Sequence, residues 1–264
     1  MNIGFFDSGL GGLLVLKATV DALPQYNYVY FGDTANVPYG DRTQENIYEL
    51  TIKALEFLFR KNCSLVIVAC NTVSSEALRK IQDVYLPQHH PDKKVLGVII
   101  PTIETVLALS NDQVTLLATS RTIDSGKYKV EFDKRLFNTE ALTLLAAPKL
   151  VPLIEAGQIE EAARQVIKKL DATARVGEVV ILGCTHYCAL KEVLRNVYQN
   201  KMVFISQDEV IPIKLSTYLQ KHPEIEMTLG HDSSVAVHLS GGETDNYKTI
   251  ASDLLKGKPI NGDD

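Results

Sequence analysis

Two cysteines stand at equivalent places in the sequence. Cys70 follows the apolar run Leu65–Ala69, Cys184 follows Val179–Gly183, and polar residues come after each cysteine. Such runs are typical of buried parallel strands, so each thiol should lie at a strand's carboxyl end, just before a helix. A single cysteine there would most simply be a small packing residue. Two at matching positions favour a pair of acid–base groups facing one substrate.

A pair of thiols on opposite sides of a cleft suits one type of reaction. One thiolate removes a proton from carbon and the other thiol returns a proton to the opposite face, which inverts the stereocentre. A thiol of ordinary pKa is only about 3% ionised at pH 7, so it needs activation to act as a base. We expect the helix N-terminus after each cysteine to lower the thiol pKa from about 8.5.

Other polar residues could assist the two thiols. Asp7 could orient Cys70 or bind an ammonium group, although an Asx turn also explains an Asp-Ser-Gly sequence. His186 could be the proton-transfer partner of Cys184 or a structural histidine, and Glu155 could lie near it. Groups that suit either substrate carboxylates or helix capping come from Ser8, Asn71, Thr72 and Thr185.

The elements that must position these residues alternate along the chain. Short β-branched apolar runs predict strands at Ile3–Phe6, Tyr28–Phe31, Leu65–Ala69, Val95–Ile100, Val114–Ala118, Leu142–Leu145, Val179–Leu182 and Met202–Ile205. Amphipathic stretches predict helices at Leu13–Leu23, Gln44–Lys61, Ser74–Tyr85, Ile103–Ala108, Ser125–Leu136, Ile159–Lys169 and Ala189–Tyr198. The alternation predicts an α/β fold with mostly parallel sheets flanked by helices, whose ligands bind beyond the carboxyl ends of the strands.

The sequence contains one internal repeat. Cys70 and Cys184 are 114 residues apart, and the same offset relates two further pairs, Val37-Pro38 to Val151-Pro152 and Ser8 to Thr122. We infer two copies of one set of βα units. This predicts two similar, pseudo-two-fold-related domains with the site in the cleft between them. The expected division is 1–100 plus 207–264 for a discontinuous first domain, and 101–206 for the second.

Composition and charge narrow the class of protein. The 264 residues are 45% hydrophobic and 22% charged, as in ordinary soluble globular proteins. The formal net charge of −5 argues against a nucleic-acid binder held by phosphate contacts. No apolar run approaches the roughly 18 residues of a membrane helix, and the N-terminus resembles a strand and not a signal peptide. We therefore expect a cytoplasmic protein with four free thiols.

Metal and nucleotide sites are not expected. Cys184 and Cys188 form a C-x3-C, but the other two cysteines are seven apart, which is not the spacing of a zinc site. Gly9, Gly11 and Gly12 do not form a G-x-G-x-x-G loop.

Several motifs together resemble the glutamate racemases of the cofactor-independent aspartate/glutamate racemase family. The most specific are the two cysteine motifs, Ala69–Thr72 and Leu182–Tyr187. The others extend the resemblance over nearly the whole chain: Asp7–Gly12, Tyr30–Ala35, Pro38–Gly40, the series Thr119, Thr122, Ser125 and Tyr128, Leu150–Leu153, and Ser240–Gly242 with Tyr247, Leu254 and Leu255.

The resemblance implies an isomerase that interconverts L- and D-glutamate without pyridoxal phosphate or a metal. It implies that Cys70 serves the D-enantiomer and Cys184 the L-enantiomer, with Asp7 and His186 assisting. It implies substrate contacts from Asp7, Ser8, Pro38, Tyr39, Gly40, Asn71, Thr72, Thr185 and His186. It further implies a homodimer that supplies D-glutamate for peptidoglycan, and so for cell-wall biogenesis and cell shape.

The chain departs from the family pattern without losing a catalytic group. The departures are Asn36 for Arg, Val73 for Ala, Ala118 for Gly, Cys188 for Pro and Ser206-Gln207 for Asp-Ser. They leave turnover, regulation and substrate size open. Three alternatives therefore stay in view: a racemase for aspartate or another amino acid, a binding protein that has lost turnover, and a thiol-redox protein. The last needs two thiols close enough to bond, which a substrate between them would prevent.

Overall fold

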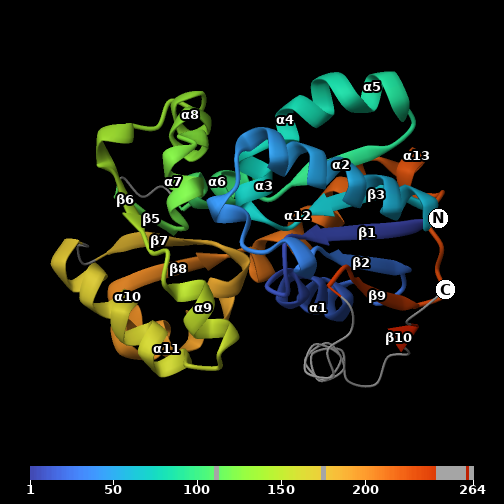
Figure 1. Cartoon of the computed structure of the whole chain (residues 1–264). Helices are drawn as coiled ribbons and strands as arrows, with labels where there is room; N and C mark the ends of the chain where they lie inside the picture. Colours follow the sequence, from blue (N-terminus) through green and yellow to red (C-terminus); the bar gives the residue numbers. More distant parts are fainter. Residues whose placement is uncertain (110–112, 174–176, 242–259, 262–264) are drawn as a thin grey trace.

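Two parallel β-sheets organise the chain (Figure 1). The computed structural model describes residues 1–109, 113–173, 177–241 and 260–261. The first sheet has the order β10-β9-β2-β1-β3-β4, made of β1 (Asn2–Asp7), β2 (Tyr28–Gly32), β3 (Cys63–Val68), β4 (Lys94–Gly97), β9 (Val235–Leu239) and β10 (Ile260–Asn261). The second has the order β6-β5-β7-β8, made of β5 (Val114–Ala118), β6 (Leu142–Ala146), β7 (Glu178–Gly183) and β8 (Met202–Ser206).

The order of the strands confirms the predicted duplication. In the first sheet, β1–β4 are arranged β2-β1-β3-β4, and the second sheet repeats this arrangement as β6-β5-β7-β8. Cys70 follows the third strand of one copy and Cys184 follows the third strand of the other. Because all the pairings are parallel, each sheet has one carboxyl edge, at which the loops that carry polar residues gather.

Helices cover both faces of each sheet. They are α1 (Gly12–Ala22), α2 (Gln44–Arg60), α3 (Asn71–Glu76), α4 (Leu78–Lys80), α5 (Leu86–His89), α6 (Ile99–Leu107), α7 (Ser120–Asp124), α8 (Lys127–Asp133), α9 (Leu150–Glu155), α10 (Ile159–Thr173), α11 (Lys191–Tyr198), α12 (Gln207–Lys221) and α13 (Pro223–Glu226). None of the helices within the described segments is long and apolar enough to cross a membrane.

Several predicted boundaries are wrong for local reasons. The predicted strand Val95–Ile100 ends at Gly97, because the chain enters α6 at Ile99. The predicted helix Ser125–Leu136 begins at Lys127, because Gly126 adopts a left-handed backbone (φ 63°) that separates α7 from α8. The predicted helix Ser74–Tyr85 is divided among α3, α4 and a π-helical turn, Ile81–Tyr85. The sequence analysis did not predict strands β9 and β10 or helices α5, α7, α9, α12 and α13.

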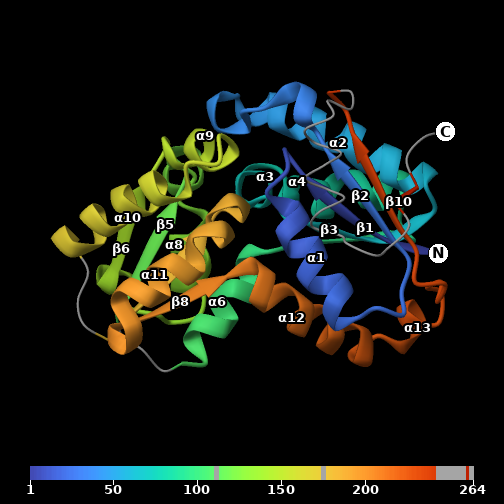
Figure 2. The same ribbon diagram turned by 90° about the horizontal axis from the view of Figure 1, so that it is seen from below.

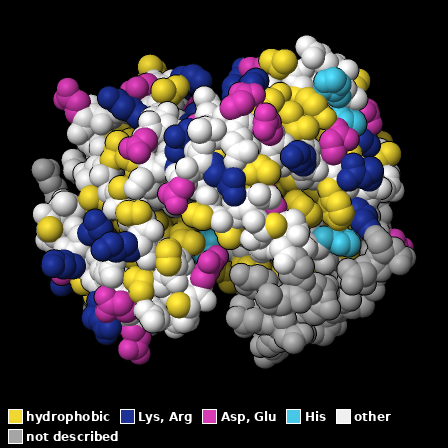
Figure 3. All heavy atoms as spheres, viewed as in Figure 1, with side chains coloured by type: hydrophobic (Ala, Val, Ile, Leu, Met, Phe, Trp, Pro, Cys, Tyr) yellow, Lys and Arg dark blue, Asp and Glu magenta, His cyan; other side chains and the backbone are white. Residues whose placement is uncertain are grey.

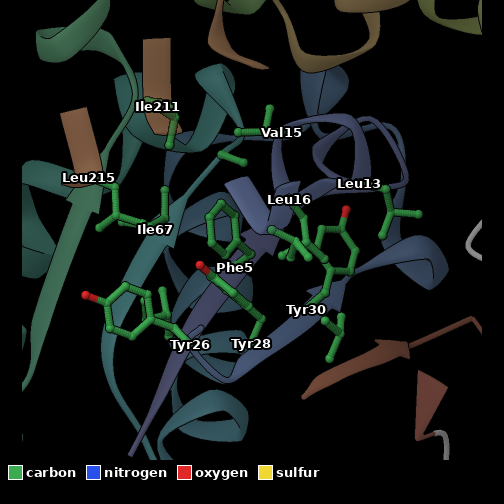
Figure 4. Close-up of a cluster of buried hydrophobic side chains, with 14 of the residues drawn as sticks. Phe5, Leu13, Val15, Leu16, Tyr26, Tyr28, Tyr30, Ile67, Ile211 and Leu215 are labelled. Atoms are coloured by element: carbon green, nitrogen blue, oxygen red, sulfur yellow. The ribbon is translucent and has the colours of Figure 1, made fainter. Parts of the chain in front are cut away.

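Each sheet is sandwiched between two apolar layers. On one face of the first sheet, Phe5 packs with Leu16 of α1 and with Ile211 and Leu215 of α12 (Figure 4). On its other face, α2 and α3 pack over β3. The second sheet lies between α9–α11 on one face and α6 with α8 on the other. Charges of both signs are interspersed over the described part of the face in Figure 3.

The chain crosses between the two sheets twice. After β4 it enters α6, whose buried residues pack on the second sheet. After β8 it enters α12, which lies beside α1 (Figure 2) and packs with it on one face of the first sheet, and β9 then pairs with β2. We call the first sheet with its helices the first lobe and the second sheet with its helices the second lobe. We propose that the lobes are the two domains, 1–100 plus 207–264 and 101–206.

Candidate active site

The carboxyl ends of four central strands meet between the two lobes. Asp7 ends β1, and Cys70, Thr119 and Cys184 follow β3, β5 and β7. Two sets of hydrogen bonds join the lobes here. The Thr185 hydroxyl donates to Asp7 Oδ2 at 3.1 Å, and Thr72 Oγ1 lies 3.3 Å from Thr119 Oγ1. The predicted catalytic side chains are therefore brought to one interface, with both cysteines buried.

Cys70 is the N-cap residue of α3, and its side chain is a buried thiol. Its Sγ lies 3.4 Å from the Ser8 hydroxyl. Burial, followed by the negative charge of Asp7, raises the pKa of Cys70 to about 12. The expectation that the helix N-terminus would lower this pKa is wrong for Cys70, because desolvation and a neighbouring carboxylate outweigh one short helix. Cys70 is therefore held as a thiol that can give a proton.

Cys184 has a different partner, the imidazole of His186. Cys184 Sγ lies 3.9 Å from His186 Nδ1, and His186 Nε2 lies 2.9 Å from Glu155 Oε1 of α9. Burial opposes the imidazolium form, but Cys184, Glu155 and Asp7 together raise the pKa of His186 to about 10. Cys184 therefore has a buried, cationic imidazole as its neighbour. The two cysteines thus sit in unlike environments.

Replacing Glu155 by glutamine is expected to lower the pKa of His186 from about 10. The substitution exchanges a carboxylate acceptor for a neutral amide of the same shape. The loss of this charged hydrogen bond should also slow turnover that begins at Cys184 about tenfold. The measurement is an NMR pH titration that follows the C2–H resonance of the His186 imidazole. This resonance is assigned by its absence from the spectrum of His186→Gln. A midpoint unchanged in Glu155→Gln would show that Glu155 does not support the imidazolium.

Asp7 bridges the two lobes as a fully buried carboxylate. Its Oδ1 accepts from the Gly9 N–H at 2.8 Å, which is the predicted Asx turn, and its Oδ2 accepts from Thr185. Burial raises the pKa of Asp7, and the charge of His186 and these hydrogen bonds oppose the rise. Asp7 therefore forms the predicted turn and also joins the first lobe to the second.

Asn71 and Thr72 begin α3 and face the second lobe. Asn71 Oδ1 accepts from the Tyr128 hydroxyl at 2.8 Å, and Thr72 Oγ1 lies 3.4 Å from Thr122 Oγ1. Asn71 Nδ2 is buried and has no hydrogen-bond partner within the described residues. A buried amide N–H without a partner costs about 1–3 kcal/mol, so it suits a ligand oxygen.

The loop with Pro38, Tyr39 and Gly40 lies against the helices of both lobes. The turn Tyr39–Asp41 contacts α3 and α7. Tyr39 is buried in the same apolar cluster as Cys70, and its hydroxyl donates to Asp33 Oδ2 at 2.6 Å. A Cβ on Gly40 would meet no atom within 4 Å, so the backbone here is open to a ligand.

The structure adds residues that sequence reasoning did not assign to the site. Asp33 accepts from Asn36 and Tyr39 and is hydrogen-bonded to Ser240, which links β9 to the loop. Thr119 and Thr122 meet Thr72, and the offset of 114 residues, which pairs Thr122 with Ser8, was the signal that could have found them. Gly242, Tyr247, Leu254 and Leu255, which carried part of the resemblance, lie outside the described residues.

The other two cysteines are apart from this chemistry. Cys63 begins β3 and Cys188 lies in the 3-10 turn Thr185–Leu190, and all four cysteines are free thiols, as predicted. Among the described residues, no group of three or more His, Cys, Asp or Glu side chains is placed to hold a metal ion.

The chain is similar in sequence to known proteins. A sequence model described as Asp/Glu/Hydantoin racemase matches residues 13–209. A glutamate racemase of Jannaschia sp. is 35% identical over 274 residues, covering 98% of this chain and 97% of that protein.

The fold of the chain is also similar to that of solved structures. A glutamate racemase isoform of Bacillus anthracis superposes with a TM-score of 0.84 at 27% identity, covering 98% of this chain and 95% of the other. The glutamate racemase of Thermus thermophilus, solved with beta-chloro-D-alanine, superposes with a TM-score of 0.77 at 30% identity, covering 98% and 94%.

Proposed function

The chain belongs to the Asp/Glu/hydantoin racemase family, and we propose that it interconverts L- and D-glutamate with Cys70 and Cys184 as the two acid–base groups. One observation carries this proposal. The two thiols follow the equivalent third strands of two four-strand sets with matching orders, β2-β1-β3-β4 and β6-β5-β7-β8, and both are buried where the lobes meet. A duplicated fold with one thiol per copy suits a reaction that treats two faces of one carbon atom.

The unlike environments of the thiols support a direction for each proton. Starting from L-glutamate, the Cys184 thiolate, paired with the His186 imidazolium, takes the proton from Cα, and the electrons of the broken C–H bond remain on the substrate. The Cys70 thiol then gives its proton to the opposite face of Cα, which forms D-glutamate. The reverse reaction begins at Cys70. The high pKa of the Cys70 thiol fits its role as the initial acid for the L-enantiomer.

The polar groups around the thiols support binding of a small dicarboxylate. Asn71 Nδ2 and the hydroxyls of Ser8 and Thr72 are donors for carboxylate oxygens. The Thr185 hydroxyl donates to Asp7, so it can accept from the ammonium group that Asp7 would bind. The loop Pro38–Gly40 would close one wall of the site. His186 is the last of the predicted substrate contacts. Because it lies next to Cys184, glutamate bound in this way would reach it.

The biological role follows as part of the same proposal. We propose that the enzyme works as a cytoplasmic homodimer without an added cofactor. Its D-glutamate would enter peptidoglycan biosynthesis, and so cell-wall biogenesis and the maintenance of cell shape. Relatives named glutamate racemase support the activity on which this role depends.

The decisive experiment incubates the purified, reduced protein with L-glutamate in D2O without an added cofactor. We expect the α-proton signal in the NMR spectrum to disappear while D-glutamate accumulates in chiral chromatography. L-Aspartate, run in parallel, should react much more slowly. Faster turnover of aspartate would assign a different substrate, and no exchange with either amino acid in folded protein would contradict a racemase.

A further inference from the structure

A tyrosine of the second lobe is hydrogen-bonded to an asparagine side chain of the first lobe. Tyr128 lies on α8 and Asn71 is the first residue of α3. The Tyr128 hydroxyl donates to Asn71 Oδ1 at 2.8 Å, and both side chains are almost fully buried, with 1% and 2% of their surface exposed. The contact therefore exists only while the two lobes lie together.

The chemistry of the contact determines which way the amide faces. An asparagine side chain is nearly symmetric in shape, so its oxygen and nitrogen can exchange places unless a partner selects one. Burial and the charge of Cys184 raise the pKa of the Tyr128 phenol above its usual range, so the phenol keeps its proton and can donate. A phenol that donates selects the oxygen of Asn71. The nitrogen is left buried without a partner in the described structure.

Within the second lobe, the Tyr128 hydroxyl has one polar neighbour, Thr102 of α6, whose own hydroxyl donates to the Val98 carbonyl. The ring of Tyr128 lies in the apolar cluster that contains Ile103 and Phe132, and a phenylalanine would fill the same space. Only the oxygen reaches across to the first lobe. Loss of that oxygen would leave the core of the second lobe intact and release the amide of Asn71.

We propose that Tyr128 is a positioning residue that fixes the Asn71 amide with its N–H2 group directed at a carboxylate of the substrate. This inference rests on the proposed function, because it takes the ligand of Asn71 to be glutamate. The contact between Tyr128 and Asn71 would couple closure of the two lobes to binding of the substrate. When the lobes part, Asn71 loses the partner that orients it, and the donor for the carboxylate is no longer fixed.

The test is a double-mutant cycle of Tyr128→Phe and Asn71→Ala, measured by racemisation kinetics. We expect Tyr128→Phe to raise KM for both enantiomers about tenfold, because one hydrogen-bond donor to the charged carboxylate is no longer held in place. The change in kcat should be smaller. In the Asn71→Ala background, Tyr128→Phe should change KM by less than about twofold, because its target is already absent.

Tyr28→Phe is the matched control. Tyr28 is also 1% exposed, and its hydroxyl donates to the Leu23 carbonyl at 2.7 Å, away from the lobe interface. Both tyrosine variants should lower the melting temperature by similar amounts, whereas only Tyr128→Phe should raise KM.

Three outcomes would overturn the inference, and they are distinguishable. An equal rise of KM in both backgrounds would show that Tyr128 acts independently of Asn71. An unchanged KM in Tyr128→Phe would leave Tyr128 a packing residue only. In both of these cases the wild-type protein racemises glutamate. A folded wild-type protein without turnover would refute the proposed function, and this inference with it.

Discussion

Replacing either Cys70 or Cys184 by alanine is expected to lower racemisation in both directions by roughly 10³-fold or more. Each turnover needs a base on one face of Cα and an acid on the other, so loss of one thiol stops inversion from either enantiomer. The two variants should nevertheless differ from each other. The structure places His186 beside Cys184, and Ser8 and Asp7 beside Cys70, so each remaining thiol keeps its own partners.

The difference between the variants is measurable as exchange without inversion. In D2O, Cys70→Ala retains Cys184 and should incorporate deuterium at Cα of L-glutamate only, because a thiol that removes a proton can return a deuteron to the same face. Cys184→Ala should do the same for D-glutamate only. NMR of the α-proton, with chiral analysis of the product, separates exchange from inversion.

Cys63→Ala is the matched control for these variants. Cys63 is also a free, buried cysteine of the first lobe, but it lies at the opposite end of β3 from Cys70. Its replacement should leave both exchange and racemisation unchanged. Exchange of both enantiomers by a single-cysteine variant would contradict the assignment of one thiol to each face.

Replacing Gly11 by alanine is expected to lower kcat/KM about 100-fold. A Cβ at this position would lie 2.5 Å from Thr185 Oγ1, 2.6 Å from His186 Nδ1 and 2.8 Å from the His186 backbone nitrogen. Side chains can turn away from a methyl group, but a backbone nitrogen cannot. The start of α1 would therefore push the loop that carries Cys184 and His186 away, and a displacement of about 1 Å at a reacting group can cost 10²-fold.

Melting temperatures separate this kinetic effect from unfolding. We expect Gly11→Ala to remain folded while its kcat/KM falls. An unchanged kcat/KM in the folded variant would mean that close approach of Gly11 to His186 is not needed for catalysis.

Some features of the site were predictable because they depend on residues that are neighbours in the chain. Buried parallel strands are continuous apolar runs, so the eight strands that carry the sheets were visible in the sequence, and the family motifs at Cys70 and Cys184 marked the ends of two of them. The repeat of 114 residues predicted the matching order of strands in the two sheets. Strand β9 was missed because its buried residues, Val235 and Val237, alternate with half-buried ones and do not form a continuous buried run.

The sequence by itself therefore determined the fold class and the duplication, and it placed two cysteines after equivalent strands. Only the tertiary structure decided the pKa values of the site residues and which side chains of separate elements contact one another. The pKa of Cys70 is raised and not lowered, because desolvation depends on how both lobes bury the thiol and not on the helix that follows it. Glu155 meets His186, and Tyr128 meets Asn71, through the packing of separate elements. Such long-range contacts leave no periodic pattern in the sequence, so only the folded chain reveals them.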